Sequence, residues 1–433
     1  MKLKQGHRNT RGIYSPLNAV IQCLSYTSPL VEELSYQPLT EAFVALLKYT
    51  SRQCSTEYTS KEYSPEQNEA FSNIFRQLYR SSPKFRQSGQ HDSHDNFIQF
   101  LNEIRSEERN RVKNAWLYGD SKKILTPVDK VFGGHFITIY DCLNCNRSNC
   151  VCDCLLDITV PISIPTHQVL QIDSGVRTGG PSRISSKQVY LEALNEEHKT
   201  PIDVGGRPVT LGECLRFYTL TGHIPEGHRC RFCRDGQKAA AAASPRTMPS
   251  ASAMKRTLIY DPPVVLVLHI KRFEETANGF TKLSDKVTYE EFLDLGPYCS
   301  SDCQRIDPED KNVWYSLFGV VVHNGSVESG HYSAYVNIRY SEPYCIKSYL
   351  QRNYLSCDEV ASQQLEKSQK PSKTKNVKVE YHPQSTTVDP WIFADDDNTR
   401  QATLEEALNQ EAFMLFYERV PGEQLFSYRY SQN

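Results

Sequence analysis

The chain has 433 residues, of which 39% are hydrophobic and 23% are charged, a balance typical of a globular protein with a sizeable core. Its 49 basic and 51 acidic residues leave a formal net charge of −2, so no overall field favours nucleic acid or an anionic membrane as a partner. No apolar run approaches the roughly 20 residues that cross a bilayer, and the polar, basic start MKLKQGHRNTRG lacks the apolar core of an export signal. We therefore expect an intracellular protein.

The N-terminal quarter of the chain has the apolar spacing of helices. Leu17, Val20, Ile21 and Leu24 recur at helical intervals, and the same spacing returns in the segment FIQFLNEI. The pattern predicts a helical lobe from Ser15 to about Arg111.

After about Pro127 the pattern changes to short β-rich runs, namely HFITIYDCL, LLDITVPISI, PPVVLVLHIKRF, YSLFGVVVHNGS, GHYSAYVNI and EAFMLFYERV. A helical lobe followed by a sheet-based lobe indicates the α+β class. Two stretches depart from this pattern of helices and strands. Residues from about Ala239 to Met254 are small and include proline, and residues from about Ser341 to Val388 are polar and contain the basic run KSQKPSKTKNVK. We expect a flexible insertion and a solvated loop there.

Fourteen cysteines in a large chain without an export signal favour thiol or metal chemistry over a disulfide framework. Two CxxC pairs, Cys142 with Cys145 and Cys230 with Cys233, each lie close to a predicted strand. Together they offer the four sulfurs of a tetrahedral zinc site, with ordinary thiols as the alternative. Four protein ligands leave no open coordination position, so this Zn²⁺ would hold structure.

A further cysteine group lies in the stretch CVCDC. Strict alternation along a strand puts Cys150, Cys152 and Cys154 on one face. We interpret them as structural thiols, with a second metal site as the alternative.

Two segments offer parts of a catalytic site. His331 begins a strand-like run beside a glycine and a polar loop, where its ring can face a cleft. Asp395 and Asp396 follow an apolar run near the C-terminus and can orient an imidazole. A nucleophile, a base and an orienting acid are the parts of covalent acyl transfer. Taken singly, such a histidine is more often a packing residue and such an acidic group a solvated turn.

Six stretches, in order, resemble the signature boxes of the ubiquitin-specific proteases, which are papain-like deubiquitinating cysteine peptidases. GIYSPLNAVIQCL is similar to the family's cysteine box, Gly-Asn-Thr-Cys-Tyr-Met-Asn-Ser-Val-Leu-Gln, and QHDSHDNFIQFL to its Gln-Gln-Asp-Ala-His-Glu-Phe helix. LHIKRF, VVVHNGSVESGHYSAYV, WIFADDD and AFMLFYER resemble the later boxes. The resemblance spans about residues 9 to 420.

The resemblance implies one hand-shaped α+β domain over residues 1–430, with a helical thumb, a palm sheet and zinc-bearing fingers. The thumb would cover residues 9–127, the fingers with part of the palm 128–260, and the palm 261–420. The two insertions, about 239–254 and 341–388, would fall within the fingers and the palm.

The resemblance also implies roles for individual residues. His331 matches the general base, Asp395 the residue that orients it, and Asp396 a helper. The zinc ligands at the fingertips match Cys142, Cys145, Cys230 and Cys233.

Other positions correspond to substrate contacts. Gln90, Asp92 and His94 match residues that help to hold the C-terminal tail of ubiquitin, although polar residues at a helix start explain them equally well. Thr10 stands at the oxyanion position where the family commonly has asparagine, with Asn9 one place away.

Ser15 occupies the position of the catalytic cysteine, and Cys23 lies two turns deeper on the wrong side of the helix. A thiol can be held as thiolate beside a histidine, whereas a serine stays protonated at neutral pH. Ser15 followed by Pro16 is also a favoured helix start. We expect a family member that binds ubiquitin and ubiquitinated proteins with weak or lost hydrolysis. The alternatives are an active deubiquitinase, with Ser15 as nucleophile or with serine replacing a native cysteine, and a non-enzymatic scaffold.

Overall fold

The computed structural model describes much of the chain, with gaps. The described residues are 15–27, 30, 43, 73–74, 76–78, 80, 92–115, 125–162, 208–228, 230–233, 251–276, 279–300, 303, 312–327, 330–338, 357, 360, 390–396 and 398–420. Within these ranges, no helix combines the length and apolar character that a bilayer crossing needs.

The principal helices are α1 (Ser15–Ser25), α5 (Ser93–Ala115), α6 (Pro127–Phe132), α9 (Leu211–Thr219) and α13 (Leu404–Leu408), with a 3-10 turn η3 (Gly296–Tyr298). The strands are β1 (Gly134–Cys142), β2 (Ser148–Leu155), β3 (Ile158–Pro161), β4 (Val209–Thr210), β5 (Gly222–His228), β6 (Ala251–Asp261), β7 (Val265–Lys271), β8 (Phe273–Thr276), β9 (Gly279–Lys282), β10 (Val287–Thr288), β11 (Phe292–Asp294), β12 (Trp314–Gly325), β13 (Gly330–Asn337), β14 (Trp391–Asp395), β15 (Asn398–Ala402) and β16 (Ala412–Arg419).

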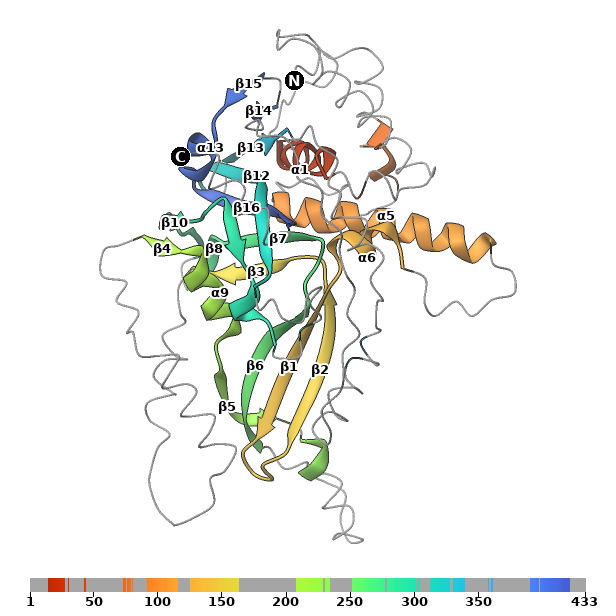
Figure 1. Ribbon diagram of the computed structural model, residues 1–433, viewed down its shortest axis with the longest axis vertical. Coiled ribbons are helices and arrows are strands. Elements are labelled where there is room, and N and C mark those ends of the chain that lie inside the picture. The colour runs from red at the N-terminus through yellow and green to blue at the C-terminus, as the bar shows by residue number, and fades with distance from the viewer. Residues whose placement is uncertain are drawn as a thin grey trace.

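Two sheets organise the molecule. The larger has the order β15-β14-β13-β12-β16-β7-β3, with β11 paired to β12, and it is antiparallel except where β3 pairs with β7. The smaller has the order β2-β1-β6-β5 and extends away from the larger sheet as a long arm (Figure 1). This division into helices, a central sheet and an arm agrees with the predicted α+β class.

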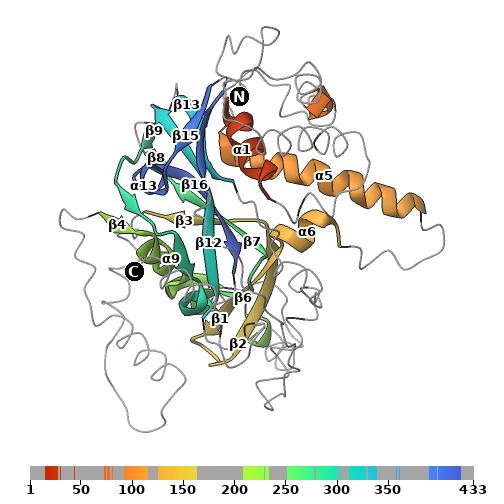
Figure 2. The same ribbon diagram turned by 45° about the horizontal axis from the view of Figure 1, so that its top comes forward.

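Helices cover the two faces of the larger sheet. One core contains apolar side chains of α1, α5 and α6 with Phe416 and Phe318, and the opposite core contains side chains of α9 and α13 with Leu415 and Tyr417. Strand β16 therefore contributes to both cores, and all eight of its residues are buried, as expected of a central strand. Helices α1 and α5 lie side by side (Figure 2).

The arginine of the LHIKRF stretch is a structural residue. Arg272 is 1% exposed, and it donates to the carbonyl oxygen of Ala412 at 2.7 Å and to those of Leu283 and Asp285 at 3.1 and 3.0 Å. A buried charge needs such partners. Arg272 therefore joins the end of β7 to the start of β16 and to the chain that follows β9.

The predicted helices and β-rich runs are confirmed where the structure describes them, with one error. The flexible insertion was predicted to extend to about Met254, but Ala251–Met254 form the start of β6 and pair with β1 and β5. Small side chains give no strand pattern in the sequence, and this part of β6 is stabilised by pairing on both of its edges. The remainder of that insertion, and all of 341–388 except Cys357 and Val360, lie outside the described residues.

Close packing of α1 on the sheet depends on Gly319 in β12. A Cβ atom at this position would lie 3.0 Å from Cys23 Sγ and 3.1 Å from Phe416 Cβ. Both neighbours are fully buried, so neither can move freely. We expect Gly319→Ala to lower the free energy of unfolding by about 1–3 kcal/mol in urea denaturation. The control is Gly222→Ala, where nothing lies within 4 Å. Equal stability of the two variants would contradict this account of α1 packing.

Candidate active site and metal centre

Strand pairing brings His331 and Asp395 together. His331 is the second residue of β13 and Asp395 is the last of β14. Because these strands are antiparallel neighbours, the two residues meet at the same end of the sheet. His331 Nε2 is hydrogen-bonded to Asp395 Oδ1. The side chains are 40% and 35% exposed, so the pair is open to an incoming molecule. The predicted base and its orienting acid are therefore adjacent.

The second ring nitrogen faces another carboxylate. His331 Nδ1 lies 3.8 Å from Asp396 Oδ2, and Asn18 Nδ2 donates to Asp396 Oδ1 at 2.8 Å. Asp396 has a φ of 41°, in the left-handed region that few residues other than glycine adopt. The hydrogen bond from Asn18 holds this turn against α1. Nothing in the sequence near Asn18 indicates this contact, because its partner lies 378 positions away.

Ser15 is the first residue of α1 and lies beside β13. Its side chain is buried, with 0% exposure, and its Oγ accepts a hydrogen bond from the backbone N–H of Tyr332 at 3.4 Å. The contact at Oγ thus runs across to the strand that carries His331. Helix α1 begins at Ser15, in agreement with the predicted helix start. Packing between α1 and β13 selects this partner.

Cys23 cannot replace a nucleophile at position 15. It is fully buried on the face of α1 that contacts Gly319, and burial raises the pKa of its thiol far above the ordinary range. The thiolate form needed for attack is therefore strongly disfavoured.

Two of the three expected tail-binding residues lie at the start of α5. Asp92 Oδ1 accepts a hydrogen bond from the backbone N–H of Asp95 at 2.7 Å, which caps the helix, and burial raises the Asp92 pKa. His94 Nε2 lies 2.8 Å from Asp157 Oδ2, and its ring stacks on His269 with centroids 4.0 Å apart. Burial, the largest influence, works to lower the His94 pKa, but Asp157 and nearby carboxylates outweigh it and the pKa is raised. Asp92 thus makes the contact of a helix-start residue, whereas His94 joins α5 to the chain before β3.

Two sequence-predicted residues cannot be placed. Gln90 and Thr10 lie outside the described residues, so the expected tail contact and the expected oxyanion position remain predictions.

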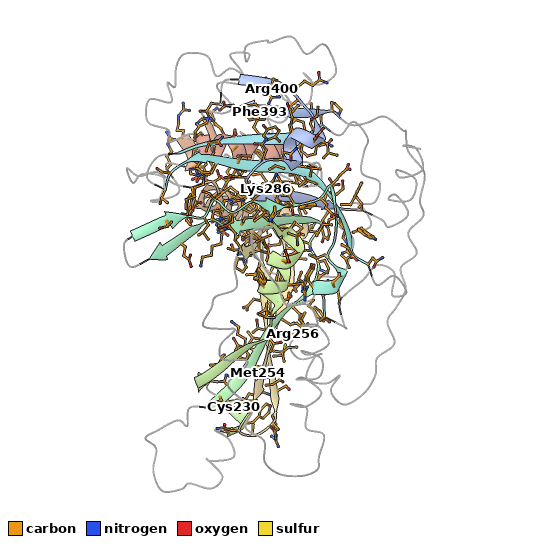
Figure 3. The ribbon with its side chains drawn as sticks, turned by 90° about the vertical axis from the view of Figure 1, so that its left-hand side faces the viewer. Cys230, Met254, Arg256, Lys286, Phe393 and Arg400 are labelled. Carbon is orange, nitrogen blue, oxygen red and sulfur yellow. The ribbon has the colours of Figure 1, made fainter. Side chains whose placement is uncertain are left out.

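The two CxxC pairs converge at the far end of the arm. Cys142 Sγ lies 3.8 Å from Cys233 Sγ, Cys145 Sγ lies 3.6 Å from Cys230 Sγ, and all four sulfurs lie within 4.8 Å of one another. A Zn–S bond of about 2.3 Å gives a tetrahedral S···S edge of roughly 3.8 Å, so the spacing fits one metal ion. Figure 3 shows Cys230 at the tip of the arm, opposite the end that carries Phe393 and Arg400.

A tight turn shapes the first half of this cluster. The backbone N–H of Asn146 donates to the Cys142 carbonyl oxygen at 2.9 Å, and Asn146 has a φ of 55°. Asparagine tolerates this left-handed conformation better than most residues. The turn aims the Cys142 and Cys145 sulfurs at the same point. A four-sulfur centre of this kind serves structure, because it has no open position for a substrate.

Cys150, Cys152 and Cys154 lie on one face of β2, as predicted, opposite Ile139, Ile137 and His135 of β1. Within the described part of the chain, the CxxC cluster is the one group that meets the geometric requirement for three or more metal ligands. The arrangement does not support the alternative of a second metal site at these three residues.

A family model described as "Ubiquitin carboxyl-terminal hydrolase" matches residues 5–417. The chain belongs to this family. The predicted family and its α+β fold, with helices, sheet and a four-cysteine arm, are thereby confirmed.

Curated relatives from several organisms belong to the same hydrolase family. Ubiquitin carboxyl-terminal hydrolase 16 of Danio rerio is 38% identical over 137 residues, which are 31% of this chain and 17% of that protein. Ubiquitin carboxyl-terminal hydrolase 1 of Arabidopsis thaliana is 33% identical over 249 residues, which are 57% of this chain and 18% of that protein. The chain thus spans less than a third of the length of these relatives.

A solved structure has the same fold. The SAGA Ubp8/Sgf11/Sus1/Sgf73 DUB module bound to ubiquitin aldehyde matches with a TM-score of 0.58 and 17% identity, over 95% of this chain and 68% of that chain. At this level of identity the match supports the fold alone.

The metal centre is testable by composition. We expect the purified chain to carry one metal ion by elemental analysis, and we expect Cys230→Ser to lose it and to melt at a lower temperature, because three sulfurs hold the arm tip less tightly than four. Cys154→Ser, at an exposed thiol of the same arm, is the control and should keep the metal. Full metal content in Cys230→Ser, or loss of metal in Cys154→Ser, would contradict the assignment.

Proposed function

We propose that this chain binds ubiquitin and that its hydrolysis of ubiquitin isopeptide bonds is weak or lost. One observation carries the proposal. His331 and Asp395 are hydrogen-bonded to each other, whereas the residue at the start of α1 is a buried serine. The base and its orienting acid persist, while the residue beside them carries oxygen in place of sulfur.

The loss of sulfur has a large chemical consequence. A cysteine thiol has an unperturbed pKa near 8.5 and is readily held as thiolate beside a histidine and at a helix N-terminus. A serine hydroxyl remains protonated until the moment of attack, so its base and oxyanion donors must be placed for the shorter bond to carbon. In addition, Ser15 Oγ accepts from the Tyr332 amide and is shielded from solvent, which hinders approach to a carbonyl carbon.

Family membership and two similar structures support ubiquitin as the partner. One solved neighbour is described as bound to ubiquitin aldehyde and another as bound to monoubiquitin. We assign the same partner here, with ubiquitinated proteins as the wider class. Asp92 and His94, together with Gln90, are the side chains that we propose for contact with the ubiquitin tail.

We propose Zn²⁺ as the ion of the arm. Four thiolates are soft ligands, and a tetrahedral arrangement of four sulfurs is typical of structural zinc. The ion would keep the tip of the fingers folded and take no part in bond cleavage. An intracellular location is consistent with so many free thiols.

Two other functions remain as alternatives. An active hydrolase would use Ser15 as nucleophile, with His331 as its base, and exposure of the His331–Asp395 pair favours this reading. A scaffold that has lost ubiquitin would retain the fold for other contacts.

Cleavage of a fluorogenic ubiquitin amide separates the three functions. We expect the chain as written to cleave no faster than Ser15→Ala, and Ser15→Cys to gain on the order of 10³-fold, because a lone nucleophile change typically alters turnover by several orders of magnitude. Adding His331→Ala to Ser15→Cys is the control and should remove the gain.

Ubiquitin binding, measured on the same proteins by calorimetry, completes the test. If the unsubstituted chain and Ser15→Cys bind ubiquitin with equal affinity, the result supports a ubiquitin-binding function. Turnover by the written chain that Ser15→Ala abolishes would establish the hydrolase, and absence of binding in a correctly folded chain would establish the scaffold.

A further inference from the structure

A second group of thiols lies on the arm, away from the metal centre. Cys152 is 9% exposed in the middle of β2, and it packs with Ile137, Leu258 and Tyr260. These residues come from three adjacent strands and form one apolar face of the smaller sheet.

Residues from a distant part of the chain complete this cluster. Cys357 and Val360 lie three positions apart, and both pack against the same apolar face. Val360 is fully buried there. The Cys357 thiol lies within hydrogen-bonding reach of the Cys152 thiol. Neither thiol is part of a disulfide, and β2 carries two further cysteines, the partly exposed Cys150 and the exposed Cys154.

We propose that Cys152 and Cys357 form a reversible disulfide under oxidising conditions, and that this bond fastens the segment between β13 and β14 to the arm. Strands β13 and β14 carry His331 and Asp395, so the bond would connect the arm covalently with the chain that joins the two halves of the candidate active site. The inference does not depend on whether the chain binds or cleaves ubiquitin.

The chemistry balances with a hydroperoxide as oxidant. The Cys357 sulfur is the more exposed of the two, and it attacks one peroxide oxygen, the O–O bond breaks, and sulfenic acid and water form. The Cys152 sulfur then attacks the sulfenic sulfur, the S–S bond forms, and hydroxide leaves with the Cys152 proton as water. Two thiols lose two electrons in total and one hydrogen peroxide is reduced to two waters.

The environment makes Cys152 the resolving thiol. The pKa of Cys152 is raised far above the ordinary range. Burial is the main cause, and the neighbouring Cys357 is the second. It is therefore a poor first nucleophile toward peroxide, and its reaction depends on a sulfenic acid already in contact with it.

Peptide mapping tests the bond directly. The full chain, loaded with zinc to protect the CxxC sulfurs, is reduced, treated with hydrogen peroxide, alkylated and digested with trypsin without reduction. We expect a linked pair of peptides, residues 148–177 with 353–367, that reductant separates. The link should persist in Cys150→Ser and Cys154→Ser and disappear in Cys152→Ser and Cys357→Ser.

A second readout measures the effect on the fold. Oxidation should raise the thermal midpoint of the chain by roughly 5 °C, since it closes a long loop, and should leave the midpoint of Cys357→Ser unchanged. Because Cys357 is only partly buried, this variant should fold even if Cys152→Ser does not. The proposal is overturned if the link persists in Cys152→Ser, if both thiols are recovered alkylated after peroxide treatment, or if the reduced chain holds two zinc ions of which Cys357→Ser removes one.

Discussion

The packing of α1 on the larger sheet is the constraint on which the candidate active site depends. The helix can approach β12 closely because Gly319 has no side chain, and the same approach brings Ser15 against β13. Asn18, one turn further along, reaches the carboxylate of Asp396. One packing arrangement therefore places the first residue of the helix, the histidine and two acidic residues in a single neighbourhood.

The residue at the start of α1 in this neighbourhood is Ser15, which has no thiol and so cannot act in thiol catalysis. Pairing of β13 with β14 aligns His331 and Asp395 through backbone hydrogen bonds, which do not depend on the identity of residue 15. A serine at that position thus coexists with an assembled His331–Asp395 pair.

Much of the fold could be predicted from local patterns. Continuous apolar runs predicted β7 and β16, and the CxxC spacing predicted the metal cluster, because a pair of thiols on a tight turn is a local property. Contacts between distant segments could not be predicted. Nothing near Cys357 indicates that it reaches Cys152, and the small residues at the start of β6 become a strand only through pairing with β1 and β5.

Other signals were present in the sequence but were not recognised. Helices α6, α9 and α13 are each preceded by an N-cap threonine, with an acidic residue three positions after it, and all three form reciprocal capping boxes. The role of Asn18 has no such local signature, since its partner Asp396 lies near the other end of the chain. Site residues on separate elements were found by resemblance to a family pattern, and their mutual geometry needed the fold.

The most direct test of the central claim uses ubiquitin whose C-terminus carries an electrophile that reacts with a correctly placed thiol. The account predicts that Ser15→Cys forms a covalent adduct with one ubiquitin, that mass mapping locates the bond at position 15, and that the chain as written forms none. This result would show that ubiquitin binds with its tail at the start of α1, beside His331 and Asp395. Failure of the folded, metal-loaded variant to react, or attachment of ubiquitin to another cysteine, would contradict the placement of the active site at the start of α1.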